Sequence, residues 1–351
     1  MSLPKSMKAA ILVELNEDLL VDEVEMPDSL DFGQVLVEVH YSGICGSQLG
    51  EIKGVKGEDK FLPHLLGHEG SGIVKSTGPR VSRFIEGDHV VLHWRPSGGI
   101  QSATPNYSLN GSGVNAGSVT TFNEYAIVSE NRITKIPNSY PLDQATLYGC
   151  AITTGFGVIE NNAKIKIGQS LVVVGAGGVG LNIIQAASMR SAFPIIAVDL
   201  FRNRLELAEN VGATHSVLSA QNSEWVEKIQ QILEDDKADV VIDNTGNTEI
   251  IRQCYNLSKE QGKTILVGVP HAGDETSIFT LPLHFGKEIT GSHGGEATPE
   301  TDIPRYIGLE KEGIFETSKI ITKVFDLDSI NEAIKAMNEG TVSGRCIIKM
   351  K

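Results

Sequence analysis

Three short stretches of the sequence carry side chains of the types that bind metal ions in proteins. They are GICGSQ with Cys45, LGHEG with His68 and Glu69, and GCAITTGFG with Cys150. Two thiolates and one imidazole suit Zn²⁺, and three protein ligands leave a fourth position for water or a substrate. Each residue alone carries little information, because a lone cysteine is more often a small buried apolar residue. We expect that ordinary role for Cys254 and Cys346.

A second motif is typical of nucleotide binding. Gly175, Gly177 and Gly180 form G-x-G-x-x-G, with Gly178 inside the same turn, between the strand-like LVVV and a helix-like segment. The first glycine permits a tight turn, the second lets the backbone approach a pyrophosphate, and the third lets helix and strand pack closely. Asp199 ends the next strand, near the expected spacing of about 20 residues.

The acidic residue decides which cofactor we expect. A carboxylate at Asp199 accepts hydrogen bonds from the adenosine ribose and repels a 2′-phosphate, which favours NAD over NADP. Arg202 and Arg204 follow the same strand. Either arginine could serve a 2′-phosphate, lie along the ribose or be a solvated charge, so NAD is the prediction and NADP the alternative.

The pattern along the chain predicts two kinds of domain. The first 90 or so residues alternate short β-rich runs with Gly and Pro, which indicates a small antiparallel β domain. Residues 95–121 are rich in Gly, Ser and Asn, and we expect an irregular surface lobe there. After Cys150, strand and helix patterns alternate, which predicts a doubly wound parallel sheet in an α/β fold. The last 25 residues predict a helix and a strand that returns to the first domain, giving domains at 1–151 with 294–351, and 152–293.

Composition excludes several classes of partner. The net charge of −14 repels phosphate backbones, so we expect no nucleic acid. No apolar run approaches the roughly 20 residues that span a bilayer, and no signal peptide is evident, so we expect no membrane partner. Four cysteines in 351 residues do not form a disulfide framework. A cytoplasmic location is the expectation.

These motifs together resemble the zinc-containing alcohol dehydrogenases of the medium-chain dehydrogenase/reductase superfamily. The resemblance rests on GHEGSGIV, GICGS, GDHVV, the glycine turn and C-x-x-x-T-G-F-G, and it covers essentially the whole chain. TTFNEYAIVSENRITKIP is most similar to the branch that includes glutathione-dependent formaldehyde dehydrogenases. The implied fold is a GroES-like antiparallel β catalytic domain plus a Rossmann domain.

The resemblance implies a role for each matching residue near the metal. Cys45, His68 and Cys150 would be the ligands of one catalytic zinc ion. Glu69 would be the carboxylate that approaches the metal during ligand exchange. Ser47 would be the hydroxyl that takes the proton of a substrate alcohol.

The resemblance also implies contacts with cofactor and substrate. Thr154 and the backbone from Val267 to Val269 would contact the nicotinamide, and Arg345 would reach the pyrophosphate. Arg204 would belong to the adenosine site. Trp94 matches a wall of the substrate pocket, although an ordinary interior aromatic residue would look the same.

Three departures from the family pattern matter. The family often has four clustered cysteines that hold a structural zinc, but residues 95–121 contain none, so we predict one metal per subunit. Gln48 stands where an aspartate usually orients the metal-bound imidazole; its amide oxygen can still accept that hydrogen bond, but without a charge it would make the ligand less basic. Gly50 stands where some members end a proton relay in histidine. Water, or one of His40, His64 and His93, would have to replace it.

The implied activity is hydride transfer between a primary or secondary alcohol and NAD, giving an aldehyde or a ketone, with zinc as Lewis acid. Three alternatives stay open. They are oxidation of a glutathione adduct such as hydroxymethylglutathione, a zinc-free quinone or enoyl reductase of the same superfamily, and a non-catalytic protein on the same scaffold. The expected partners are a small alcohol or carbonyl compound and further copies of the chain, as a homodimer or homotetramer.

Overall fold

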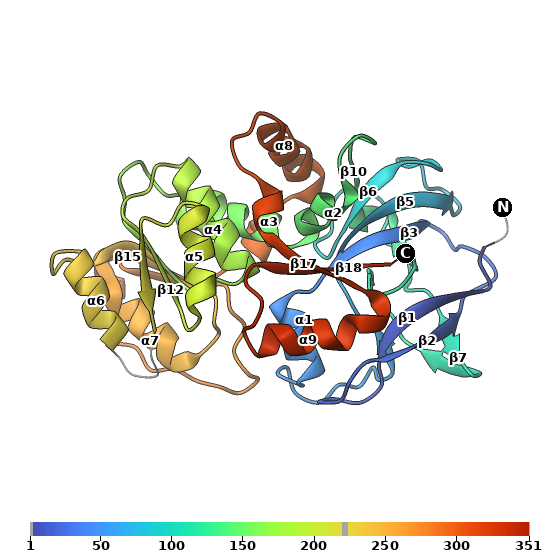
Figure 1. Cartoon of the computed structure of the whole chain (residues 1–351), viewed down its shortest axis with the longest axis horizontal. Helices are drawn as coiled ribbons and strands as arrows, with labels where there is room; N and C mark the ends of the chain where they lie inside the picture. The colour runs from blue at the N-terminus through green and yellow to red at the C-terminus, as the bar shows by residue number, and fades with distance from the viewer. Residues whose placement is uncertain (1–2, 220–223, 351) are drawn as a thin grey trace. The chain divides into compact units, whose positions relative to one another are not determined.

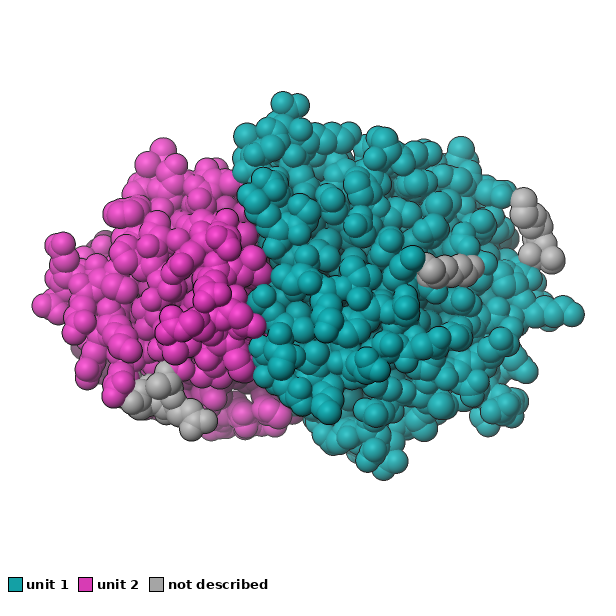
Figure 2. All heavy atoms as spheres, in the orientation of Figure 1, with its two compact units in different colours: residues 1–150, 298–351 teal, residues 151–297 magenta. Residues whose placement is uncertain are grey.

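The computed structural model describes residues 3–219 and 224–350, which form two compact units (Figures 1 and 2). Unit 1 comprises Met1–Cys150 and Thr298–Lys351, and unit 2 comprises Ala151–Ala297. The sequence alone placed these two limits after residues 151 and 293. No helix in the described ranges is both long enough and apolar enough to cross a membrane.

Unit 1 is built around two β-sheets. Its strands are β1 (Ser6–Leu12), β2 (Leu20–Glu25), β3 (Gln34–Gly43), β4 (His64–Leu65), β5 (Glu69–Thr77), β6 (His89–His93), β7 (Tyr107–Leu109), β8 (Ser112–Val114), β9 (Tyr125–Ser129), β10 (Ile133–Lys135), β17 (Ile321–Asp326) and β18 (Arg345–Lys349). One sheet has the order β4-β1-β2-β7-β8. The other has the order β10-β6-β5-β3-β18-β17, with β9 also paired to β3. Every pair is antiparallel except β17 with β18, so the predicted antiparallel domain is confirmed.

Four helices accompany these sheets. They are α1 (Gly46–Ile52), α2 (Leu142–Ala145), α8 (Pro299–Lys311) and α9 (Ile330–Asn338). The C-terminal segment supplies α9 and then β18, which pairs with β3 through Ile347 to Lys349, as the red and blue strands show in Figure 1. The predicted return of the tail to the first domain is therefore confirmed. The core between the sheets is formed by alternating apolar residues such as Val35, Val37 and Val39.

The expectation for residues 95–121 was partly wrong. This segment contains the hairpin β7–β8, which extends the smaller sheet through pairing with β2. Asn110 and Gly111 have φ values of 52° and 78°, as a two-residue hairpin turn requires. Asn-Gly is a strong hairpin signal in a sequence, and Tyr107 is buried on the resulting strand.

Unit 2 is a six-stranded parallel sheet with helices between its strands. Its strands are β11 (Leu171–Val174), β12 (Ile195–Asp199), β13 (His215–Leu218), β14 (Ala238–Asp243), β15 (Ser258–Leu266) and β16 (Glu288–Gly291). Its helices are α3 (Ala151–Gly157), α4 (Gly178–Met189), α5 (Arg202–Asn210), α6 (Glu224–Ile232) and α7 (Thr248–Leu257). The order β13-β12-β11-β14-β15-β16 reverses direction beside β11, which makes this a doubly wound sheet as predicted. Strands β11 and β12 are buried throughout, which explains their unbroken apolar sequences.

Candidate metal centre and nucleotide site

The three predicted metal ligands meet in the interior of unit 1. Cys45 directly precedes α1, His68 lies between β4 and β5, and Cys150 follows the 3₁₀ turn Thr146–Gly149. Their ligand atoms all lie within 4.8 Å of one another. Gly67 has a φ of 89°, and a Cβ there would lie 2.4 Å from the Thr121 hydroxyl, so only glycine fits directly before His68.

The geometry fits a tetrahedral zinc ion. Zinc bound at about 2.3 Å from each of two sulfurs requires those sulfurs to be about 3.8 Å apart. The Sγ atoms of Cys45 and Cys150 are 4.0 Å apart, and both side chains are buried. Soft thiolates in a protected site are the donor set that zinc prefers, so the residues present fit the metal that the motifs imply.

The two thiols and the imidazole influence one another strongly. The hydrogen bond with Cys150 lowers the pKa of the Cys45 thiol well below its usual value, and the charges of Arg345 and His68 assist. The same hydrogen bond, together with burial, raises the pKa of Cys150. Burial opposes the charged form of His68, but the Cys45 thiolate outweighs it and raises the pKa of His68. These directions favour the Cys45 thiol over the Cys150 thiol as the first of the two to lose its proton.

A buried ion pair lies beside this centre. An Nη atom of Arg345 is 3.1 Å from Oε1 of Glu69, and both side chains are almost completely buried. The same guanidinium donates to the backbone oxygen of Ile44 at 2.6 Å, directly before Cys45. A Cβ at Gly43 would lie 2.7 Å from the Glu69 carboxylate, so glycine makes room for it. The sequence predicted both charged residues separately, but nothing in it indicated that they pair.

Gln48 does not make the hydrogen bond that its place in the sequence allowed. Its side-chain oxygen accepts from the backbone N–H of Gly67, and its amide nitrogen donates to Glu51 at 2.9 Å. The hydrogen bond that this oxygen could have accepted from the imidazole of His68 is therefore not the one it makes. The amide instead fixes the backbone beside the ligand, because α1 carries it next to the turn at Gly67.

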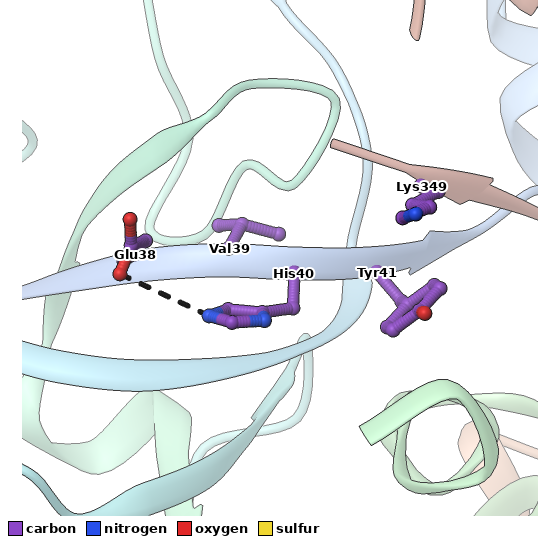
Figure 3. A pocket seen from close by; sticks show the side chains of 5 residues that line it. All are labelled: Glu38, Val39, His40, Tyr41 and Lys349. Atoms are coloured by element: carbon purple, nitrogen blue, oxygen red, sulfur yellow. Dashed lines mark ion pairs between the residues drawn. The ribbon is translucent and has the colours of Figure 1, made fainter. Parts of the chain in front are cut away.

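The three histidines considered for proton transfer have different surroundings. His93 is buried, its ring nitrogens lie 2.7 Å from the Arg95 carbonyl and 2.9 Å from the Thr134 hydroxyl, and burial lowers its pKa to about 4. His40 lines a small pocket on β3 and lies 3.8 Å from the Glu38 carboxylate (Figure 3). His64 lies 2.8 Å from the Asp59 carboxylate. A neutral, buried His93 is unsuited to carrying protons near pH 7.

Two further predicted residues lie in unit 1. Ser47 is half-buried in the first turn of α1, two positions after Cys45. Trp94 is half-buried directly after β6, with the Arg95 guanidinium 5.7 Å from its ring centroid and its backbone oxygen bonded to Arg132. Their roles toward a proton and a substrate stay predictions.

The glycine turn of unit 2 has the shape that a pyrophosphate needs. Gly175 has a φ of 96°, and a Cβ at Gly180 would lie 2.0 Å from the Gly175 oxygen. A Cβ at Gly177 would meet no atom within 4 Å, so the turn is open on that side. Helix α4 begins at Gly178 without a side-chain cap, which leaves its first N–H groups free for an anion.

Asp199, the last residue of β12, forms hydrogen bonds with the backbone of the glycine turn. Its two carboxylate oxygens accept from the backbone N–H groups of Ala176 at 2.8 Å and Phe201 at 3.0 Å. An Nη atom of Arg204 lies 3.8 Å from this carboxylate, and its guanidinium is 4.7 Å from the Phe201 ring centroid. The turn, the helix start and the carboxylate fit a dinucleotide, since they offer an anion site beside an acceptor for ribose hydroxyls.

The remaining predicted cofactor residues are spread over both units. Thr154 is buried in α3, while Val267 and Val269 follow β15, with Val269 exposed. A Cβ at Gly268, between them, would lie 2.2 Å from the Gly246 nitrogen, which explains the glycine there. Arg345 belongs to unit 1 and pairs with Glu69. Its contact with a pyrophosphate, like the other cofactor contacts, stays a prediction.

Comparison with known proteins places the chain in a family. The family described as zinc-binding dehydrogenase matches residues 178–309, and the alcohol dehydrogenase GroES-like domain matches residues 31–138. S-(hydroxymethyl)glutathione dehydrogenase of Paracoccus denitrificans is 31% identical, with 95% of this chain and 97% of that protein covered.

Solved structures agree with these matches. The benzyl alcohol dehydrogenase of Acinetobacter calcoaceticus is similar with a TM-score of 0.88 and 30% identity, covering 99% of this chain and all of that one. An alcohol dehydrogenase zinc-binding domain protein of Burkholderia ambifaria has a TM-score of 0.89 and 26% identity, with 99% of each chain covered. The predicted fold class, a Rossmann sheet with a GroES-like domain, is confirmed. The chain belongs to the zinc-containing alcohol dehydrogenases, which are oxidoreductases of the medium-chain dehydrogenase/reductase superfamily.

Proposed function

We propose that this chain transfers a hydride between a primary or secondary alcohol and NAD, with one catalytic zinc ion held by Cys45, His68 and Cys150. The observation that carries the proposal is the convergence of these side chains, whose ligand atoms lie within 4.8 Å of one another. Zinc bound there would supply Lewis-acid chemistry, and NAD would accept the hydride.

The surrounding residues would support this chemistry in separate ways. Burial of both thiols keeps bulk water away from the reacting groups and strengthens electrostatic interactions among them. Arg345 balances part of the negative charge that Glu69 and the thiolates bring to the site. Ser47 would accept the proton of the alcohol at its hydroxyl and pass it toward water.

We propose that each subunit holds a single zinc ion bound by cysteine thiolates. Two of the four cysteines belong to the catalytic set, and Cys254 and Cys346 are buried on α7 and β18. Residues 95–121 contain no cysteine, so they lack the thiolates of a four-cysteine structural site.

The same reasoning supports NAD as the cofactor. Asp199 presents a carboxylate at the end of β12, where a 2′-phosphate would be repelled. Gly175, Gly177, Gly178 and Gly180 would cradle the pyrophosphate, and Thr154 with the backbone at Val267 and Val269 would face the nicotinamide. A homodimer or homotetramer and a cytoplasmic location remain part of the proposal.

The substrate has two candidate classes. Trp94, half-buried beside the end of β6, favours an alcohol with an apolar or aromatic body, as in the structurally similar benzyl alcohol dehydrogenase. The glutathione adduct named for the Paracoccus relative is the second candidate. A panel of primary, secondary and aromatic alcohols and S-(hydroxymethyl)glutathione, each assayed with NAD, separates the two.

The metal assignment is tested with Cys45→Ala, Cys150→Ala and the matched control Cys254→Ala. The first two variants should lose the zinc ion of the catalytic site, and with it turnover, yet still bind NADH, as followed by its fluorescence. The control should keep zinc and activity, because Cys254 lies in the core of unit 2. Full turnover in a Cys45→Ala preparation that has lost the catalytic zinc ion would contradict the proposal.

A further inference from the structure

A second group of metal-binding side chains lies in unit 1, apart from the two cysteines. Glu51 lies in the last turn of α1, Asp59 in the loop that follows, and His64 at the start of β4. One ligand atom from each lies within 4.8 Å of the others. No sequence motif brings these three residues together, since the loop between α1 and β4 determines their approach.

The imidazole of His64 has a defined orientation. Its Nδ1 lies 3.0 Å from the backbone oxygen of Leu65, which can only accept, so Nδ1 carries a hydrogen. Its Nε2 lies 2.8 Å from Oδ2 of Asp59. A ring that donates from one nitrogen to a carbonyl and directs the other at a carboxylate has the arrangement typical of a metal-bound histidine.

Each carboxylate is also oriented by a donor outside the group. Oδ1 of Asp59 accepts from the backbone N–H of Phe61 at 2.9 Å, and Oε2 of Glu51 accepts from the side-chain amide of Gln48 at 2.9 Å. All three side chains thus have an outer hydrogen bond that fixes them, as the outer partners of metal ligands do. His64 is 7% exposed, while the carboxylates are half-buried, so water can reach the open side.

Two carboxylates and one imidazole nitrogen, all of which can bind a cation through a lone pair, lie together here, and the carboxylates carry two negative charges. A proton on Nε2 of His64 can form only the hydrogen bond to Asp59. A divalent cation, in contrast, can be bound by all three residues at once. We propose that Glu51, Asp59 and His64 form a second metal site for a divalent transition ion such as Zn²⁺, completed by water. One imidazole and two carboxylates are an accepted donor set for zinc and manganese.

Binding requires a small adjustment. Ligand atoms about 2.0 Å from a tetrahedral zinc ion are about 3.3 Å apart. The 2.8 Å contact between His64 and Asp59 must therefore open by about half an ångström. Asp59 lies in the loop between α1 and β4. This site would be additional to the one metal per subunit that the absence of a four-cysteine cluster predicted. Through Gln48, which bonds to both Glu51 and Gly67, the second site is linked to the backbone beside His68.

The test measures metal content of the full chain after equilibrium dialysis against micromolar Zn²⁺. The wild type should hold about two ions and His64→Gln about one, and the exposed-residue control His271→Gln should match the wild type. Cys45→Ala should retain the His64-dependent ion, and the double variant Cys45→Ala/His64→Gln should lose both. Asp59→Asn repeats the test in case His64→Gln does not fold, which circular dichroism would reveal.

A spectroscopic measurement adds an independent readout. Cys45→Ala loaded with Co²⁺ should show weak visible bands of an oxygen and nitrogen site, and His64→Gln should remove them. Equal zinc content in the wild type and His64→Gln, or cobalt bands unchanged by that substitution, would overturn the second site. Loss of zinc by Cys45→Ala tests the catalytic assignment separately, so the two proposals can fail independently.

Discussion

The guanidinium of Arg345 lies 3.1 Å from the carboxylate of Glu69, in the interior of unit 1 and close to two thiols. Two charges removed from water stabilise a protein weakly as a pair, but either one alone is costly to bury. The pair therefore makes the metal centre sensitive to changes at a residue that need not be a metal ligand.

Glu69→Gln should destabilise the protein by about 3–5 kcal/mol, because it removes the carboxylate that pairs with the buried Arg345 and leaves only the thiols to balance its charge. Urea denaturation at pH 7 measures this loss. The exposed pair of Glu249 with Arg252 supplies the control, since Glu249→Gln should leave the midpoint unchanged. Adding Arg345→Met to Glu69→Gln should recover part of the lost stability. No recovery would show that the charge of Arg345 is not the cause.

Zinc uptake by the metal-free protein should release protons in a pH-dependent number. At pH 6 the Cys150 thiol and the protonated His68 both give up a proton, so about two protons should leave for each zinc bound. Cys45 should contribute fewer protons than Cys150, because its pKa is lowered while that of Cys150 is raised.

The count should approach about one as the pH rises and His68 becomes neutral before zinc arrives. Zinc affinity should rise over the same range, because fewer protons must be displaced. Calorimetric titrations in buffers with different ionisation enthalpies give the count. A release of no protons at pH 6 would contradict the raised pKa values of Cys150 and His68.

Asp199→Ala should shift cofactor preference toward NADP. The substitution removes the carboxylate that would repel a 2′-phosphate and leaves Arg204, now without its neighbour at 3.8 Å, able to attract one. The ratio of kcat/KM for NADP to that for NAD should rise by about 10–100-fold, which corresponds to roughly 1.4–2.8 kcal/mol. Adding Arg204→Ala should abolish most of that gain. An unchanged ratio in Asp199→Ala would contradict the NAD assignment.

His93 should make the protein sensitive to mild acid. Its pKa is about 4 in the folded protein and 6.5 in the reference state, so between these values the unfolded chain binds more protons. Stability from this residue is complete above pH 6.5 and is lost as the pH falls toward 4, by about 3 kcal/mol in total.

The matched variant is His93→Asn, whose side chain can still donate to the Arg95 carbonyl but does not titrate. Its unfolding free energy should fall less steeply between pH 6.5 and 4 than that of the wild type. Denaturation curves at several pH values measure the difference. Parallel curves for the two proteins would mean that His93 is not held neutral by burial.

Local signals explain why the strand, glycine turn and helix at the start of the parallel sheet could be predicted in detail. Gly175 and Asp199 belong to a contiguous strand-turn-helix-strand segment, where spacing along the chain translates directly into distance. The pairing of β7 with β8 was equally local, and the Asn110-Gly111 turn contained the signal that we overlooked.

The contacts that the sequence did not predict join residues that are far apart in the chain or lie on loops. The partner of Gln48 depends on where the turn at Gly67 lies relative to α1, and a periodic pattern does not encode that position. The Glu69–Arg345 pair joins residues 276 positions apart, and the group of Glu51, Asp59 and His64 depends on the path of a loop. Such contacts follow only from tertiary structure.

Unit 1 is formed by two separate segments of the chain, so its C-terminal residues are synthesised long after the rest of the unit. Arg345 bonds to the carbonyl of Ile44, which the ribosome adds 301 residues earlier. At 5–20 residues per second, the nascent chain carries both thiols and Glu69 for roughly 10–40 seconds before their cationic neighbour is made. During that interval β3 also lacks β18 along Tyr41–Gly43, an unpaired edge that attracts other strands. Unit 2, which is contiguous, is synthesised completely before that edge is covered, so it can fold while unit 1 still lacks β18.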